Sequence, residues 1–203
     1  MEPKYTVARD GWNASTWQIY SHAGTHMDAQ IHFAAGEETI EQHTLERCMG
    51  NAWVVPLSPC LPQALLTVAH LGAIAAKFAP GDSLLLHTGW SAHVNDTSLY
   101  RDRMPRISEE LAYWCVERRV KLLGVEPPSI ADVNNLDEVT RIHRILLEGG
   151  VTIVEGLTNL DRLRESYVYF YALPLRLAGG DGSPVRAFAI EDGSAIAEGL
   201  ERL

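Results

Sequence analysis

The sequence predicts one α/β domain in which a β-sheet is flanked by helices. Short apolar runs bounded by turn residues alternate with longer amphipathic segments, as strands and helices do in this class. The chain has 203 residues, of which 46% are hydrophobic and 21% charged, an ordinary composition for a domain with a full-sized core. The sequence contains no evident repeat, low-complexity segment or linker, so we expect the domain to span residues 1–203.

Charge and composition narrow the expected partners and compartment. A formal charge of −9 argues against a surface for nucleic acid or anionic membrane, which requires clustered Lys and Arg. The start of the chain, residues 1–5, lacks a signal-peptide profile, and no apolar run approaches the ~20 residues of a membrane span. Cys48, Cys60 and Cys115 form no CxxC pair. We therefore expect a soluble cytoplasmic protein with reduced thiols and no nucleic-acid or membrane partner.

The first elements lead into a stretch rich in metal-type side chains. Residues 5–21 favour an extended lead-in, with a turn at Asp10–Gly11 and strand-forming residues at 16–20. From His22 to His32 the even positions are polar or small, whereas most odd positions are apolar. This alternation predicts an extended segment with its polar side chains on one face.

This polar face is typical of a metal site. The even positions are His22, Gly24, His26, Asp28, Gln30 and His32. On a flat strand of ~3.3 Å per residue, His22 and His26 would stand ~13 Å apart, so we expect the chain to bend at Gly24. Imidazole and carboxylate ligands suit Zn²⁺, Mn²⁺ or Fe²⁺, and the lack of a nearby cysteine argues against a closed structural zinc site.

The same residues resemble the H-x-G-T-H-x-D-x-P-x-H signature of the cyclase-type metal-dependent hydrolases. That family includes bacterial kynurenine formamidase, isatin hydrolase and trans-dienelactone hydrolase. The resemblance covers about residues 7–190 and implies a swivelling β/β/α fold with a mixed sheet. Gln30 replaces the family's usual proline, so we expect its amide to be offered to substrate. Relatives usually carry a further opening strand and proline-rich loop, so we expect a shorter N-terminal segment here.

The middle of the chain alternates strands and helices. We expect a strand at 53–57, a helix from Thr67 to about Phe78, and a buried strand opening the run 83–90. The end of that strand delivers Thr88 and Trp90 to a loop, where ligand sites of α/β sheets collect. The family has a similar Thr-Gly-Trp stretch near its active site. Thr88 and Trp90 are therefore candidate substrate contacts, with simple packing as an equal alternative.

The next part of the chain is predicted to contain two helices and two strands, and each strand ends in a glutamate. Ser108 begins a helix, and the strand at 121–126 ends in Glu126, which we expect to be a solvated turn residue. Asn135 begins another helix, which Gly149–Gly150 ends and whose apolar stripe includes His143. A strand at 151–155 then ends in Glu155, whose burial would be costly unless a cation or hydrogen-bond donors meet it.

The resemblance assigns roles to these residues. A lone histidine such as His143 is more often a core residue than a ligand, but the family pairs a helical His with a strand-end Glu, which His143 and Glu155 match. The implied ligands of one or two divalent ions, with Zn²⁺ expected and Mn²⁺ as the alternative, are His22, His26, Asp28, His143 and Glu155. We assign His32 the role of general base and then acid, with a further ligand or orienting group as the alternative.

The predicted reaction is hydrolysis of a small amide by metal-activated water. The sequence lacks G-x-S-x-G, P-loop and G-x-G-x-x-G motifs. The resemblance implies an arylformamide such as N-formylkynurenine, or a cyclic imide, lactam or lactone, and a homodimer or larger homo-oligomer. Two alternatives stay open. One is a non-haem Fe(II) oxygenase that uses His26, Asp28 and His143, and the other is a non-catalytic protein that keeps the metal for stability.

Overall fold

The computed structural model describes residues 1–191, and its centre is a seven-stranded mixed sheet that closes on itself. Four neighbouring strands run parallel: β4 (Met49–Pro56), β6 (Ser83–His87), β8 (Leu122–Val125) and β9 (Thr152–Glu155). Three antiparallel strands complete the ring: β3 (His26–Asp28), β10 (Tyr167–Pro174) and β11 (Gly182–Ile190). The α/β class and the mixed sheet are confirmed.

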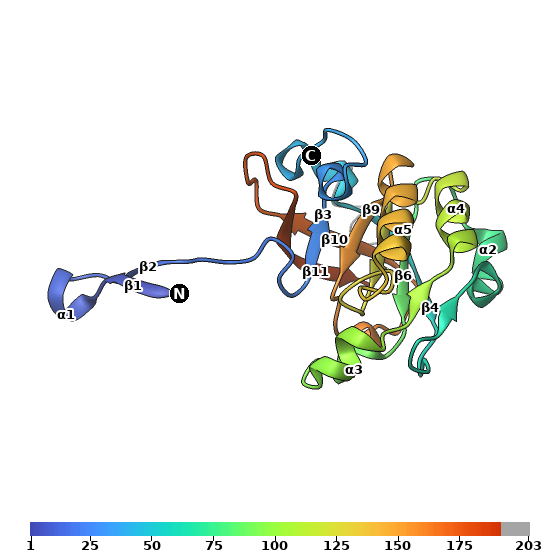
Figure 1. Cartoon of the computed structure of the whole chain (residues 1–203), viewed down its shortest axis with the longest axis horizontal. Helices are drawn as coiled ribbons and strands as arrows, with labels where there is room; N and C mark the ends of the chain where they lie inside the picture. Colours follow the sequence, from blue (N-terminus) through green and yellow to red (C-terminus); the bar gives the residue numbers. More distant parts are fainter. Residues whose placement is uncertain (192–203) are drawn as a thin grey trace.

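Two helices connect the parallel strands and cover the same side of the sheet (Figure 1). They are α4 (Glu109–Glu117) and α5 (Leu136–Glu148). Both begin where the sequence predicts. The Ser108 hydroxyl accepts a hydrogen bond from the Leu111 amide at 3.1 Å, and the Asn135 side chain accepts one from the Glu138 amide at 3.1 Å. These contacts satisfy amides that lack a partner within the helix.

The helix predicted for residues 67–78 is wrong. A 3₁₀ turn, Val68–Leu71, and the short α2 (Ile74–Lys77) take its place. Gly72 lies between them with φ +53° and ψ −131°, a backbone conformation outside the helical region. The apolar residues that suggested one helix therefore belong to two separate turns, which still pack against the core.

Short elements complete the body. The strands β5 (Leu65–Leu66) and β7 (Arg106–Ile107) form a separate parallel pair, and α3 (Thr97–Asp102) follows β6. The remaining 3₁₀ turns are Gln30–Phe33, Ile40–Gln42, Leu45–Arg47, Trp90–His93 and Leu160–Arg162.

The N-terminal segment extends away from the sheet (Figure 1). It contains β1 (Glu2–Tyr5), α1 (Val7–Asp10) and β2 (Ala14–Thr16), which pairs with β1. Gly11 has φ +81°, so the turn expected at Asp10–Gly11 is confirmed. Residues 17–20 are exposed and lie in no strand, contrary to their β propensity.

Side chains from the ring of strands divide between two cores. One core has contributions from strands all around the ring and fills its interior, with Met27 and Phe170 among its members. The other packs the parallel strands against α4 and α5. Because side chains alternate along a strand, an inward Met27 directs His26 and Asp28 to the opposite face of β3.

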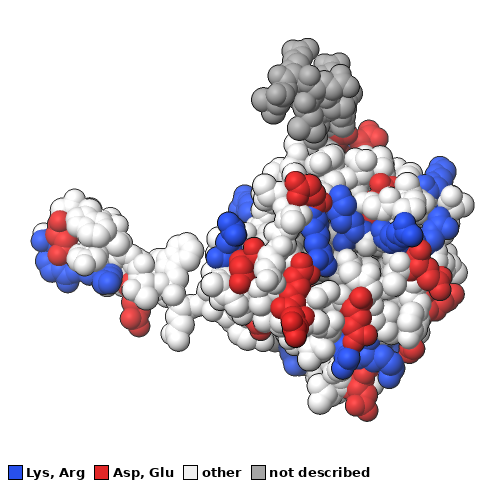
Figure 2. Space-filling model, turned by 90° about the horizontal axis from the view of Figure 1, so that it is seen from above, with Lys and Arg blue, Asp and Glu red and all other residues white. Residues whose placement is uncertain are grey.

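The surface carries both signs of charge. Figure 2 shows Lys and Arg interspersed with Asp and Glu over the visible face. Among residues 1–191, no helix combines the length and apolar character needed to cross a bilayer.

Candidate metal centre

The pairing of β3 with β9 brings together the first two expected ligands. His26 lies opposite Glu155 in this antiparallel pair. Its Nε2 is 3.2 Å from Glu155 Oε2, and both side chains are buried. The other ring nitrogen, Nδ1, is 2.9 Å from the Gly24 carbonyl oxygen, which fixes the direction of the imidazole.

Helix α5 brings His143 to the same carboxylate. Its Nε2 lies 3.2 Å from Glu155 Oε1 and 3.7 Å from Asp28 Oδ2. Its Nδ1 lies 2.7 Å from the carbonyl oxygen of Val139, one helical turn earlier. The Phe33 ring stacks on the imidazole at 4.2 Å between centroids. The helical histidine and the strand-end glutamate, distant in sequence from His26 and Asp28, thus lie beside them.

His22 joins the cluster from the loop before β3. The bend expected at Gly24 is present, with φ +64°. His22 Nδ1 consequently lies 2.9 Å from Asp28 Oδ1. Gly182, opposite Asp28 in β11, makes room for the ring, since a Cβ atom there would stand 2.6 Å from His22 Cε1.

The five expected ligands form two overlapping sets that fit divalent ions. In each set the ligand atoms lie within 4.8 Å of one another: His22, His26 and Asp28 in one, and Asp28, His143 and Glu155 in the other. Asp28 is buried, and its Oδ2 has no hydrogen-bond partner among the described residues. A buried carboxylate oxygen is costly unless a cation meets it, and imidazole with carboxylate suits Zn²⁺ or Mn²⁺.

The charges of these groups are strongly linked. Burial opposes the imidazolium form, but the hydrogen bond and charge of Glu155 raise the pKa of His26 to about 9. Burial likewise opposes the carboxylate, yet His143 and His26 hold the pKa of Glu155 at about 2. These opposite shifts of pKa favour a protonated imidazole at His26 beside an ionised Glu155. An ion has to replace this proton in order to bind.

His32 lies at the edge of this centre. Its imidazole stacks on that of His22, with 3.8 Å between centroids, and its side chain is 24% exposed. It belongs to neither of the two ligand sets that contain Asp28, but one of its ring nitrogens lies within 4.8 Å of ligand atoms of His22 and Asp181 in a third, less buried group. Burial lowers its pKa, which favours a neutral ring that can accept a proton near neutral pH. The carboxylate of Asp181, a residue that we did not predict from the sequence, lies next to both His32 and His22.

Gln30 points away from the expected ligands. Its Nε2 donates to the Leu147 carbonyl oxygen at 3.1 Å, near the C-terminal end of α5. The chain leaves the strand conformation after Asp28 and turns into the 3₁₀ segment Gln30–Phe33, so residue 30 no longer shares the face of His26. This position gives no support to a substrate contact by the Gln30 amide.

Thr88 and Trp90 are both buried supports of the loop after β6. The Thr88 hydroxyl donates to Glu126 Oε2 at 3.0 Å, and the Trp90 indole donates to the Tyr100 carbonyl oxygen at 2.9 Å. Each side chain is 1% exposed. Their positions favour the packing alternative over direct contact with substrate.

The expectation that Glu126 is a solvated turn residue is wrong. Its side chain is buried and accepts hydrogen bonds from Thr88 Oγ1, from the Gly89 amide at 2.5 Å and from Ser91 Oγ at 2.8 Å. The strands β6 and β8 are parallel neighbours, so residues that follow their carboxyl ends meet. The sequence signal for this contact was the Thr-Gly-Trp-Ser run that follows β6 together with the glutamate that follows β8.

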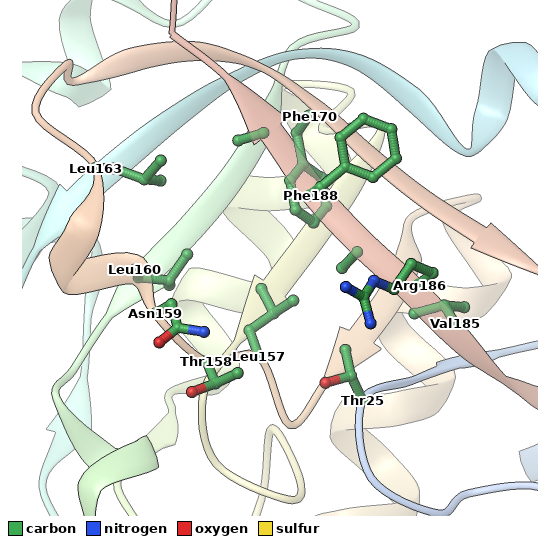
Figure 3. A pocket seen from close by; sticks show the side chains of 12 residues that line it. Thr25, Leu157, Thr158, Asn159, Leu160, Leu163, Phe170, Val185, Arg186 and Phe188 are labelled. Carbon is green, nitrogen blue, oxygen red and sulfur yellow. The ribbon is translucent and has the colours of Figure 1, made fainter.

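A cavity of about 490 Å³ opens beside the imidazoles of His22 and His26. Its other lining residues are apolar or carry hydroxyl groups, among them Ser91, Val94, Tyr100, Pro128, Leu157 and Thr158. A second cavity, of about 450 Å³, shares Thr25, Leu157 and Thr158 with the first but extends toward Phe170 and Phe188 (Figure 3). Only the first of these two reaches the expected ligands, so it is the better candidate for the reacting group of a substrate.

Comparisons with known proteins agree with this arrangement. A family model described as "Putative cyclase" matches residues 2–132. Kynurenine formamidase from Bordetella petrii is 32% identical over 183 residues, which cover 89% of this chain and 82% of that protein. Isatin hydrolase A from Ralstonia solanacearum is 25% identical, with a TM-score of 0.81 over 93% of this chain and 80% of the other. A structure described as a potential metal-dependent hydrolase with cyclase activity is 26% identical, with a TM-score of 0.70, over 85% of this chain and 80% of the other.

Proposed function

We propose that this chain, which belongs to the cyclase family of metal-dependent hydrolases, cleaves an arylformamide such as N-formylkynurenine by addition of water. Cyclic imides, lactams and lactones are the next substrates to test, since an isatin hydrolase has the same fold. The observation that carries the proposal is the convergence of two ligand sets on Asp28 beside an open cavity.

The ligands of the proposed centre are the two sets already described. His22, His26 and Asp28 would hold one divalent ion, and Asp28, His143 and Glu155 a second, with Zn²⁺ expected and Mn²⁺ as the alternative. A bound ion supplies a Lewis acid and makes hydroxide available near neutral pH. The chain itself contributes the orientation of each imidazole and a buried, low-dielectric surrounding in which the charges act strongly.

His32 is the proposed proton carrier. Its neutral ring takes a proton from the attacking water and delivers it to the leaving nitrogen as the C–N bond breaks. One water molecule is consumed, the amine is released, and the formyl group leaves as formic acid, which gives formate and a proton near neutral pH. The partial exposure of His32 and its stack on His22 support this role, since water can reach a partly exposed imidazole that lies against an expected ligand.

The first cavity provides a surface for the rest of the substrate. Val94, Pro128 and Leu157 are apolar and suit an aromatic ring. Ser91 and Thr158 also line this cavity and carry hydroxyl groups. We therefore expect aryl formamides to be cleaved with a lower KM than formamides that lack a ring.

A His32→Ala variant tests the proposed chemistry. We expect it to retain metal and fold but to lose a factor of ~10²–10⁴ in kcat on an arylformamide. The matched control is His70→Ala, which removes an exposed histidine from the 3₁₀ turn Val68–Leu71 and leaves the rate unchanged. Elemental analysis and a screen of formamides, imides and lactones accompany the assay. An unchanged rate in His32→Ala would overturn the assigned role.

The two alternative functions are not favoured. An Fe(II) oxygenase triad of His26, Asp28 and His143 leaves His22 and Glu155 without a role, although both face the same centre. Turnover of an amide without oxygen or 2-oxoglutarate separates that model from ours. A non-catalytic role leaves the open cavity beside the ligands unexplained.

We also infer that the chain acts as a cytoplasmic homodimer or larger homo-oligomer. Its N-terminal segment exposes apolar side chains, including Trp17 at 71% and Ile19 at 57%, which a second copy could cover. Three free thiols are consistent with a reducing compartment. Light scattering on the purified protein tests the assembly, and a monomer at micromolar concentration would contradict it.

A further inference from the structure

We propose that Asp181 is a positioning residue that holds the imidazoles of His22 and His32 in their working orientations. Its Oδ2 lies 3.3 Å from His22 Nε2 and 3.9 Å from His32 Nδ1. The inference rests on the proposed function, because it gives these two histidines different tasks at one metal centre.

The three expected histidine ligands share one pattern. In each, one ring nitrogen faces the carboxylates of the centre and the other faces an acceptor outside it. That outer acceptor is the Gly24 carbonyl for His26 and the Val139 carbonyl for His143. For His22 the inner nitrogen is Nδ1, at 2.9 Å from Asp28 Oδ1, and the outer acceptor is Asp181. His22 thus differs from the other two by having an anionic acceptor.

An anionic acceptor has a stronger effect than a carbonyl. A carboxylate that receives the outer N–H fixes the tautomer of a ligating imidazole and makes its inner nitrogen a better donor to the ion. His22 needs such support, since it lies in the loop before β3 and no strand pairing holds it. Asp181, the residue before β11, supplies to His22 what the backbone of α5 supplies to His143.

The backbone around Asp181 is held on both sides. The carbonyl oxygen of Asp181 accepts a hydrogen bond from the Ala29 amide at 2.9 Å, and that of Gly180 accepts one from the Ile40 amide at 2.9 Å. The Gly179 amide donates to Glu41 Oε1 at 2.9 Å. These contacts fix the backbone of the turn that ends at Asp181, and this backbone carries its half-exposed carboxylate beside the imidazoles.

The same carboxylate faces the proposed proton carrier. At 3.9 Å, His32 Nδ1 is beyond a direct hydrogen bond but within reach of a bridging water. An acceptor on this side favours the tautomer with hydrogen on Nδ1. Nε2 is then the basic nitrogen that takes the proton from water.

The experiment uses the metal-loaded protein with two substitutions. Asp181→Asn removes the charge and keeps the size, whereas Asp181→Ala also removes the acceptor. Each protein is exposed to graded chelator, and the retained metal is measured by elemental analysis. We expect half of the metal to be lost at ~10-fold lower chelator in Asp181→Ala, with a smaller shift in Asp181→Asn. On an arylformamide, kcat falls in both, whereas KM changes by less than about twofold.

The control is Glu41→Gln, which weakens the same turn without touching either imidazole. Wild-type metal retention and kcat in both Asp181 variants would overturn the inference, as would equal losses in Glu41→Gln, which would indicate a merely structural effect of the turn. If Asp181→Ala fails to fold, Asp181→Asn decides. If the unaltered protein binds no divalent metal or cleaves no amide, the proposed function fails instead, so the two failures are distinguishable.

Discussion

Replacing Gly156 by alanine should weaken metal binding, although Gly156 is not itself an expected ligand. Gly156 follows Glu155 with φ +67°, a left-handed conformation. A Cβ atom there would stand 2.6 Å from the Gly24 carbonyl oxygen and 3.1 Å from its carbon, both of them backbone atoms. Gly24 forms the bend between His22 and His26, so the chain that has to move is the one that sets the spacing of two expected ligands.

The cost has two parts. An L-residue in the left-handed region costs ~1–2 kcal/mol. Forcing an extra methyl group against packed backbone adds ~1–3 kcal/mol. The Gly156→Ala variant should therefore lose ~2–5 kcal/mol of unfolding free energy, which leaves a domain of ordinary stability folded but weakened.

Gly150→Ala is the matched control. Gly150 also has a positive φ, +79°, and precedes the same strand, but a Cβ atom there would meet no atom within 4 Å. It should lose only the ~1–2 kcal/mol of backbone strain and keep its metal. Urea unfolding of the metal-free proteins gives the two losses, and chelator titration gives metal retention. Equal losses and equal retention in the two variants would refute the reasoning, because the close approach to Gly24 would then carry no energy.

Three further outcomes are expected. Glu126→Gln removes a buried charged acceptor and should cost ~1–3 kcal/mol of unfolding free energy. Its KM should rise, because the loop that carries Ser91 shifts. The exposed Glu148→Gln is the control and should change stability by less than about 0.5 kcal/mol, so equal effects in the two variants would contradict the prediction. Leu111→Ala should cost ~2–5 kcal/mol of unfolding free energy, measured with urea, yet keep wild-type metal retention. Loss of metal in this variant would contradict the expectation that the core around Leu111 and the metal site are energetically independent. The pKa of His26 is raised to about 9 in the fold, so its stabilising effect is complete below about pH 6.5 and is lost as pH rises through 9. Metal-free protein should therefore unfold at a lower urea concentration at pH 9.5 than at pH 6. The reverse order would contradict the pairing of His26 with Glu155.

Features that depend on near neighbours in sequence were predictable. The caps at Ser108 and Asn135, the bend at Gly24 and the alternation through β3 each rest on a few consecutive residues. The break at Gly72 was missed because apolar spacing alone does not distinguish one helix from two turns.

Contacts between distant segments were less accessible. The polar face of residues 22–32 indicated a metal site, but His143 and Glu155 became ligand candidates only through the family resemblance. Glu126 was misjudged and Asp181 was overlooked because their partners come from other elements of the fold. The register of β11 against β3, which sets Asp181 beside His22, leaves no mark in either segment alone.

Sharing Asp28 between the two ligand sets has a consequence for loading. Its Oδ1 faces His22, and its Oδ2 faces His143. In the proposed two-ion centre, the first cation would neutralise much of the negative charge of this carboxylate. A second cation would then be attracted less strongly and would also be repelled by the first. Occupancy should thus rise in two steps as free metal increases, and scarcity would leave a population of half-filled molecules.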